Sequence, residues 1–174
     1  MKAVASLLAA LSLACAAQPE SDFAPIYRVL TSPRCLNCHT GTGFPRQSDE
    51  RRRHDFLVVR GADNRGAAAM RCSTCHTAVN SGNLPGAPHW SLAPLSMSWE
   101  GLSEGQLCRR LVDPQRNGRR SVEMLLQHMA SDPLVGWGWA PGGRRQPVEM
   151  PKEEFLRALQ AWSAGGARCP GTID

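Results

Sequence analysis

The chain lacks several features on which many enzymes and nucleotide-binding proteins depend. No glycine-rich phosphate loop follows a strand pattern, so a nucleotide cofactor is not supported. Clustered pairs of acidic residues suited to acid–base catalysis are also absent. Aromatic residues make up only 6% of the 174 residues, and a single tyrosine is among them. These side chains alone supply little apolar mass for the core of a chain of this size.

Long apolar runs are scarce beyond the N-terminus. The run Ala3–Ala14 follows the positive charge of Lys2 and is too short to span a bilayer as a permanent anchor. Small residues come next, and this order is typical of a signal peptide, here residues 1–17. We therefore expect export to the periplasm. Lipid anchoring at Cys15 is the alternative, but Ser12 stands where a lipobox normally has leucine.

Two copies of one short string are present in the chain. They are Cys35-Leu36-Asn37-Cys38-His39 and Cys72-Ser73-Thr74-Cys75-His76, each preceded by arginine and followed by threonine. A Cys-x-x-Cys-His string is the attachment site of a c-type haem. The thiols of Cys35, Cys38, Cys72 and Cys75 would form thioethers to the porphyrins. His39 and His76 would then be the proximal iron ligands.

Two other uses of a Cys-x-x-Cys pair account for fewer of these residues. A structural zinc ion would be satisfied by four thiolates, which leaves His39 and His76 without a role. A thioredoxin-like redox site expects one such pair beside a strand–helix unit, and no such unit is visible in the sequence. The haem interpretation uses all six residues, so we expect two haem c cofactors, each with its iron.

The positive charge of the chain does not indicate nucleic-acid binding. Its formal net charge is +5, with 20 basic and 15 acidic side chains. Loss of Lys2 with the signal peptide leaves 19 basic side chains and a net charge of +4. Four ionised haem propionates would reduce this charge to about zero. We expect no nucleic-acid partner, and we expect Arg34 and Arg71, beside the thioethers, to pair with propionates.

Seven cysteines are an odd number, and their positions explain the odd count. Four belong to the two motifs and Cys15 lies in the predicted signal peptide, which leaves Cys108 and Cys169. In an oxidising compartment these two are expected to form a disulfide. Closing a loop of this length contributes about 4 kcal/mol to stability on the chain-entropy model.

The sixth ligand of each iron has several candidates. The order of residues favours His54 and His89, one after each motif, as the distal ligands of two bis-histidine irons. His128 is an alternative, since it shares a helix face with Met124 and would reach a haem beneath the C-terminal helices. Met97 is a second alternative, and its thioether would raise the reduction potential. Chain order does not decide whether each distal histidine serves its own haem or the neighbouring one.

Helical periodicity dominates the sequence, and strand patterning is almost absent. The predicted fold class is mainly α: a compact, loop-rich dihaem cytochrome c with short helices, a C-terminal helical region and little or no β-structure. Residues 18–100 are expected to form the dihaem-binding region and residues 101–174 a C-terminal helical region packed on the haems, within one compact domain. Helices are expected at 21–31, after a capping box of Ser103 and Gln106, at 121–130 and from Pro151 to Gly165, with a tight aromatic loop at 135–143.

Taken together, the motifs resemble those of small dihaem members of the multihaem cytochrome c class. Three strings, Pro85–Trp90, His128–Trp139 and Cys169-Pro170, are similar to a family labelled as the isoquinoline 1-oxidoreductase-associated subunit. The resemblance implies a redox protein partner such as a molybdenum hydroxylase. It also implies electron transfer from the iron–sulfur centres of that partner to a respiratory acceptor.

The function expected from the sequence is that of a periplasmic electron carrier with two six-coordinate irons. It would bind no substrate and would be peripheral to a membrane at most. The alternative is a dihaem enzyme, or a gas or redox sensor, with one open iron position as in peroxidases. Dihaem peroxidases carry a second full domain, which this chain length does not accommodate.

Overall fold

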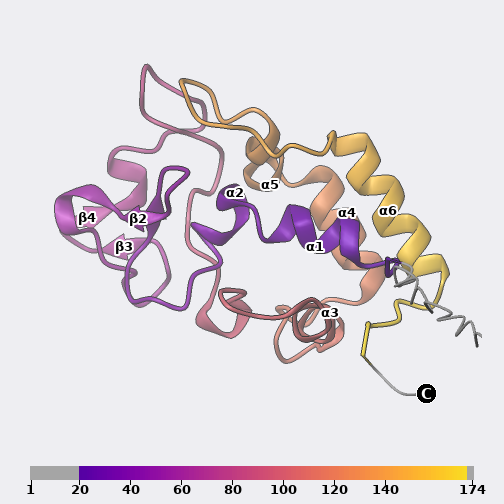
Figure 1. Cartoon of the computed structure of the whole chain (residues 1–174). Helices are drawn as coiled ribbons and strands as arrows, with labels where there is room; N and C mark the ends of the chain where they lie inside the picture. The colour runs from indigo at the N-terminus through magenta and orange to yellow at the C-terminus, as the bar shows by residue number, and fades with distance from the viewer. Residues whose placement is uncertain (1–19, 172–174) are drawn as a thin grey trace, which may run out of the picture.

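The computed structural model of the chain describes residues 20–171 (Figure 1). The predicted signal peptide and Cys15 lie outside these residues. Helices dominate, and the strands within the described part form two short antiparallel pairs. They are β1 (Arg46–Gln47) with β2 (Arg52–Arg53), and β3 (Gly66–Ala67) with β4 (Met70–Arg71). The predicted mainly α class with little β-structure is confirmed.

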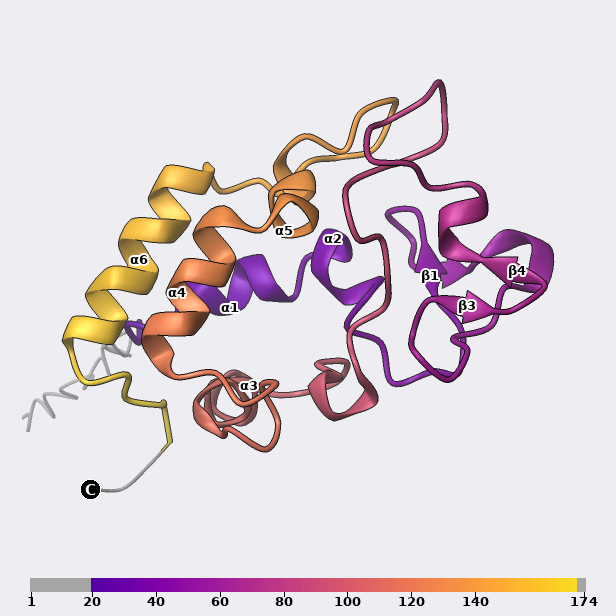
Figure 2. The same cartoon turned by 180° about the vertical axis from the view of Figure 1, so that it is seen from behind.

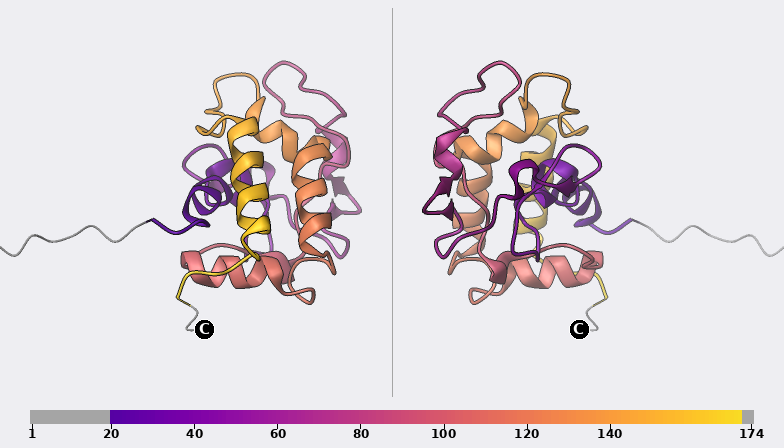
Figure 3. Two further views of the ribbon diagram at one scale, coloured as in Figure 1. Left: turned by 90° about the vertical axis from the view of Figure 1, so that its right-hand side faces the viewer. Right: turned by 90° about the vertical axis from the view of Figure 1, so that its left-hand side faces the viewer.

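The helices gather at one end of the molecule and the paired strands at the other (Figures 1 and 2). Figure 3 shows α4 and α6 side by side, with α3 crossing beneath them. None of the helices within residues 20–171 is both long and apolar enough to cross a membrane. The helices are α1 (Ala24–Leu30), α2 (Pro33–Leu36), α3 (Glu104–Val112), α4 (Val122–Ser131), α5 (Pro133–Gly136) and α6 (Lys152–Ala164). Single 3₁₀ turns are η1 (Asp55–Leu57), η2 (Cys72–Thr74), η3 (Leu95–Met97) and η4 (Trp137–Trp139).

Local sequence signals explain where the longer helices begin and end. The predicted capping box at α3 is confirmed, since Ser103 N–H donates to Gln106 Oε1 at 2.8 Å and Ser103 Oγ accepts from Gln106 N–H. Helix α6 begins after Pro151 and ends at Gly165, as predicted. Its buried residues are Phe155, Leu159 and Trp162.

The aromatic segment before α6 differs from its prediction. Instead of a loop it begins with α5 and η4, two short helical turns. The reason is a cap: the Asp132 carboxylate accepts hydrogen bonds from the backbone N–H groups of Leu134 at 2.8 Å and Val135 at 3.2 Å. Pro133 at the first helical position supports the same turn.

One hydrophobic core joins α1, α3, α4 and α6. Phe23, just before α1, is fully buried against Trp162 of α6, with ring centres 5.4 Å apart. The predicted disulfide between Cys108 and Cys169 is present, with Cα atoms 5.5 Å apart, and it ties the C-terminal segment to α3. The other core side chains are Ile26, Val29, Leu30, Leu36, Trp99, Leu107, Leu111, Leu125, Met129, Val148, Phe155 and Leu159.

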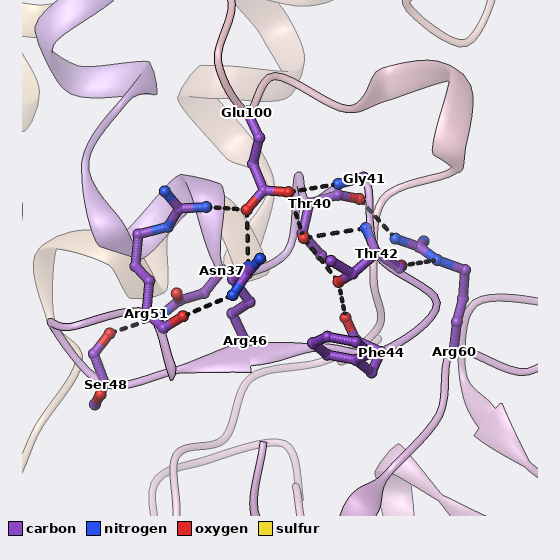
Figure 4. A network of polar contacts seen from close by, with 10 residues as sticks. All are labelled: Asn37, Thr40, Gly41, Thr42, Phe44, Arg46, Ser48, Arg51, Arg60 and Glu100. Atoms are coloured by element: carbon purple, nitrogen blue, oxygen red, sulfur yellow. Dashed lines mark hydrogen bonds and ion pairs between the residues drawn. The ribbon is translucent and has the colours of Figure 1, made fainter. Parts of the chain in front are cut away.

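Between Thr40 and Gly86 the chain buries no apolar side chain. Polar contacts hold this segment instead (Figure 4). The buried guanidinium of Arg60 donates to the carbonyl oxygens of Thr40 at 2.8 Å and Thr42 at 3.2 Å, and to Asn64 Oδ1 at 2.9 Å. Buried donors satisfied in this way fix the loop paths, but they add little net stability.

Glu100 is the second centre of the polar network (Figure 4). One carboxylate oxygen accepts from Thr40 Oγ1 at 2.7 Å and from Gly41 N–H at 2.8 Å. The other accepts from Arg46 Nε at 2.8 Å and from the guanidinium of Arg51. Glu100 therefore joins the end of the first motif to the β1–β2 hairpin.

Candidate functional site

The two Cys-x-x-Cys-His motifs fold in the same way. In the first motif, Cys38 N–H and His39 N–H both donate to the carbonyl of Cys35, at 3.2 and 2.9 Å. In the second, Cys75 N–H and His76 N–H donate to the carbonyl of Cys72 at the same two distances, 3.2 and 2.9 Å. The sequence repeat is thus a repeat in three dimensions. Each turn brings the backbone of the histidine back to the carbonyl of the first cysteine.

Each motif histidine is held by a backbone carbonyl. The Nδ1 of His39 lies 2.9 Å from the Met97 oxygen, and the Nδ1 of His76 lies 2.7 Å from the Pro85 oxygen. Since a carbonyl only accepts, Nδ1 carries the proton and the lone pair remains on Nε2. Metal-binding histidines are commonly held by this arrangement, because it fixes both tautomer and ring orientation.

A tryptophan lies flat against each of these rings. Trp99 stacks on His39 with ring centres 3.4 Å apart and planes 9° apart. Trp90 stacks on His76 with ring centres 4.5 Å apart and planes again 9° apart. Each motif imidazole is therefore fixed by one hydrogen bond and one stacked face.

The contact between the Pro85 carbonyl and His76 depends on a close approach of the backbone at Gly86 to that at Val79. A Cβ atom on Gly86 would lie 2.1 Å from the Val79 carbonyl oxygen, so only glycine fits there. Asn80 Oδ1 accepts from Gly86 N–H at 2.9 Å and closes the same loop. The loop therefore returns toward the motif, and the carbonyl of Pro85 meets His76.

Burial tunes the titration of the motif residues. It lowers the pKa of His39 to about 4 and lowers the pKa of His76, so both are neutral near pH 7 and able to bind a metal. It raises the pKa of Cys35 to about 11. Burial, followed by the thiols of Cys35 and Cys72, raises the pKa of Cys38 to about 12. The two motifs are joined through one segment, because Trp90 stacks on His76 and Ala93 N–H donates to the Cys38 carbonyl at 3.3 Å.

The motif cysteines do not gather into a zinc-type site. Within residues 20–171, no three His, Cys, Asp or Glu side chains converge as a metal centre would require. The four motif cysteines are free thiols, of which Cys75 is exposed and Cys35, Cys38 and Cys72 are half-buried.

The three other histidines have different surroundings. His54, at the end of the β1–β2 hairpin, has its ring centre 5.9 Å from that of His76 and its plane at 79°. His128 lies on α4, where its Nδ1 is 3.4 Å from Asp132 Oδ2. His89 is exposed, has a positive φ of 62°, and makes no hydrogen bond or ring contact with residues 20–171. The ring of His54 thus contacts that of His76, whereas His89 lines the open pocket beside His76 without a ring contact to it.

Met97 is buried, and its backbone carbonyl is the group that holds His39. That contact places the Met97 backbone on the Nδ1 edge of the ring, away from Nε2. The Met97 sulfur lies 3.6 Å from where a Cβ on Gly118 would be. Met97 therefore holds the histidine of the first motif through its backbone, a role that the sequence did not indicate. Chain order carries no signal for it, because Met97 is far from His39 in the sequence.

The two arginines beside the motifs already have carboxylate partners. Arg71 donates to both oxygens of Asp63, at 3.1 and 2.6 Å. Arg34 forms an ion pair with Asp49, and its side chain is 2% exposed. The Nε of Arg34 is buried without a hydrogen-bond partner among the described residues. At the second motif, Arg71, which was expected to pair with a propionate, is thus paired with Asp63. At the first motif, Arg34 keeps one donor without a partner among the described residues.

Comparison with family models, with curated proteins and with solved structures finds no match to this chain.

Proposed function

We propose that this chain is a periplasmic electron-transfer protein that carries two covalently attached c-type haems. The observation that carries the proposal is the repeated arrangement at the two motifs. In both, two thiols flank an imidazole whose Nδ1 is engaged, whose ring is fixed by tryptophan and whose Nε2 keeps its lone pair. Bound haem would supply a one-electron ferric–ferrous couple.

The missing core between Thr40 and Gly86 supports the same proposal. Ordering a residue costs about 1–2 kcal/mol of conformational entropy, which apolar burial normally offsets. Here large apolar side chains are instead exposed, among them Phe56 at 81%, Leu57 at 70% and Val79 at 69%. They surround the second motif in sequence, and porphyrin is a large apolar surface of the kind that would cover them.

The residues that would hold each group follow from the motifs. Cys35 and Cys38 would carry the first haem, with His39 as proximal ligand. Cys72 and Cys75 would carry the second, with His76 as proximal ligand. Because the segment from Trp90 to Ala93 contacts both His76 and the Cys38 carbonyl, the two groups would be neighbours. Adjacent haems suit electron transfer between a donor and an acceptor, for which we propose a dehydrogenase or molybdenum hydroxylase and a respiratory protein.

Attachment is tested by counting haems in the exported protein. The wild-type chain is expected to carry two, by mass spectrometry and by the pyridine haemochrome spectrum. Replacing Cys35 and Cys38 by serine should remove one haem, and replacing Cys72 and Cys75 should remove the other. The variants Ser73→Ala and Thr74→Ala change only the intervening residues and should keep both. A wild-type protein that binds zinc and no haem would refute the proposal.

The two haems are expected to have different reduction potentials. The first motif is more buried than the second, where Cys75 is exposed. Burial disfavours the more highly charged ferric state, so the first haem should be the easier to reduce. We expect two one-electron steps separated by about 60 mV or more, a tenfold difference in equilibrium constant. A spectroelectrochemical titration measures this, and the variant without Cys35 and Cys38 should lose the higher step.

A further inference from the structure

We infer that the distal ligand of the second haem crosses over from the first haem segment. His54, which follows the first motif in the chain, binds the second haem iron opposite His76. His89, which follows the second motif, does not bind this iron. The inference rests on the proposed function and names a ligand of one of the same two sites.

The position of His54 is the first argument. Two imidazoles that bind one metal from opposite faces have ring centres about 6 Å apart, because each metal–nitrogen bond is about 2 Å long. The ring centres of His54 and His76 are 5.9 Å apart. The proton on His54 Nδ1 is engaged by the Asp55 carbonyl at 2.7 Å, which leaves the lone pair on Nε2. His54 is thus held in the same way as the two motif histidines.

The backbone around His54 fixes it in place. His54 N–H donates to the Pro45 carbonyl at 3.0 Å, and Asp55 N–H donates to Gln47 Oε1 at 3.2 Å. The next residues, Phe56 and Leu57, have positive φ values of 60° and 51°. Bulky residues rarely adopt this conformation. Two such residues in succession form the sharp turn that follows His54.

His89 has none of these features. It is exposed, and its ring has neither a hydrogen bond nor a ring partner among residues 20–171. A metal-binding histidine almost always has its second nitrogen engaged. His89 is therefore the matched control for His54, since both lie near His76 and only the ring of His54 is held by a hydrogen bond and a ring contact.

The experiment replaces one histidine at a time in the dihaem protein and determines which iron loses its sixth ligand. The Cys75→Ala variant labels the second haem, because a haem with one thioether keeps a vinyl group and its reduced α band moves to longer wavelength. In this background, His54→Ala should make the labelled haem high-spin and able to bind CO. His89→Ala should leave both haems low-spin and closed to CO. Helical circular dichroism checks that each variant is folded.

The outcomes separate this inference from the proposed function. If His89→Ala opens the labelled haem, or if His54→Ala opens the unlabelled one, the crossover is wrong although two haems are present. If both haems stay low-spin and closed to CO in His54→Ala, His54 is not a ligand. Binding of CO to the labelled haem before any histidine is replaced would also contradict the crossover and support an enzyme or sensor. A protein without haem refutes the proposed function itself.

Discussion

Protein made without haem should lose the structure of residues 40–86 and keep that of its helices. In a variant with all four motif cysteines replaced by serine, the amides of Arg60, Gly66 and Cys72→Ser should exchange at no less than about a tenth of the unfolded rate. This limit corresponds to a free energy of local opening of at most about 1.4 kcal/mol. These amides are hydrogen-bonded, but the segment around them buries no apolar side chain. Hydrogen exchange followed by mass spectrometry measures the loss.

The helical core provides the internal comparison for that experiment. Amides in the interior of α6, such as that of Leu159, should stay protected, because α6 packs on α1 and α4 through fully apolar contacts. Attachment of haem to the wild-type chain should then restore protection at Arg60 and Gly66. Strong protection of these two amides in the haem-free variant would show that the polar network alone is sufficient to order the segment.

Replacing Glu100 by alanine should destabilise the protein by about 3 kcal/mol. The side chain is 22% exposed, and its loss would leave the guanidinium groups of Arg46 and Arg51 without their carboxylate. Thr40 and Gly41, which follow the first motif, would lose an acceptor at the same time. Urea unfolding of the haem-loaded wild type and variant measures the difference. The isosteric Glu100→Gln should cost less, since an amide oxygen still accepts.

The same carboxylate predicts a pH dependence. Burial raises the pKa of Glu100, but hydrogen bonds from Thr40 and Gly41 and the charges of Arg46 and Arg51 outweigh it and hold the pKa below 4.5. A carboxylate whose pKa is lower in the folded state stabilises that state when the pH is above its ordinary pKa. This stability is lost as the pH falls through the pKa of the folded state. The difference in free energy of unfolding between wild type and Glu100→Gln should therefore shrink below about pH 4.5. An advantage that stays constant down to pH 3 would contradict this account.

The turns at the two Cys-x-x-Cys-His motifs and the helix ends were predictable because both depend on neighbouring residues. The capping box at Ser103 and the end of α6 at Gly165 are signals of a few residues, and they occur where the sequence places them. The disulfide was predictable by elimination, since Cys108 and Cys169 were the two cysteines without another role. The aromatic loop was mispredicted because the capping strength of Asp132 was overlooked.

The surroundings of the motif histidines were not predictable in the same way. Met97 and Trp99, which fix His39, come from a distant loop, whereas Pro85 and Trp90, which fix His76, come from a nearby one. No common spacing relates the two sets, so no repeat in the sequence marks them. Only the path of each loop determines which carbonyl and which indole arrive at the ring.

The sequence by itself determined the two Cys-x-x-Cys-His turns, because their hydrogen bonds join residues three and four positions apart. It also determined the helical class and the pairing of the last two cysteines. Only the tertiary structure decided that His54 lies beside His76 and that His89 stays exposed. The physical reason is that chain order favours the nearest histidine after each motif. Strained turns and hairpin contacts instead direct His54 toward the other motif.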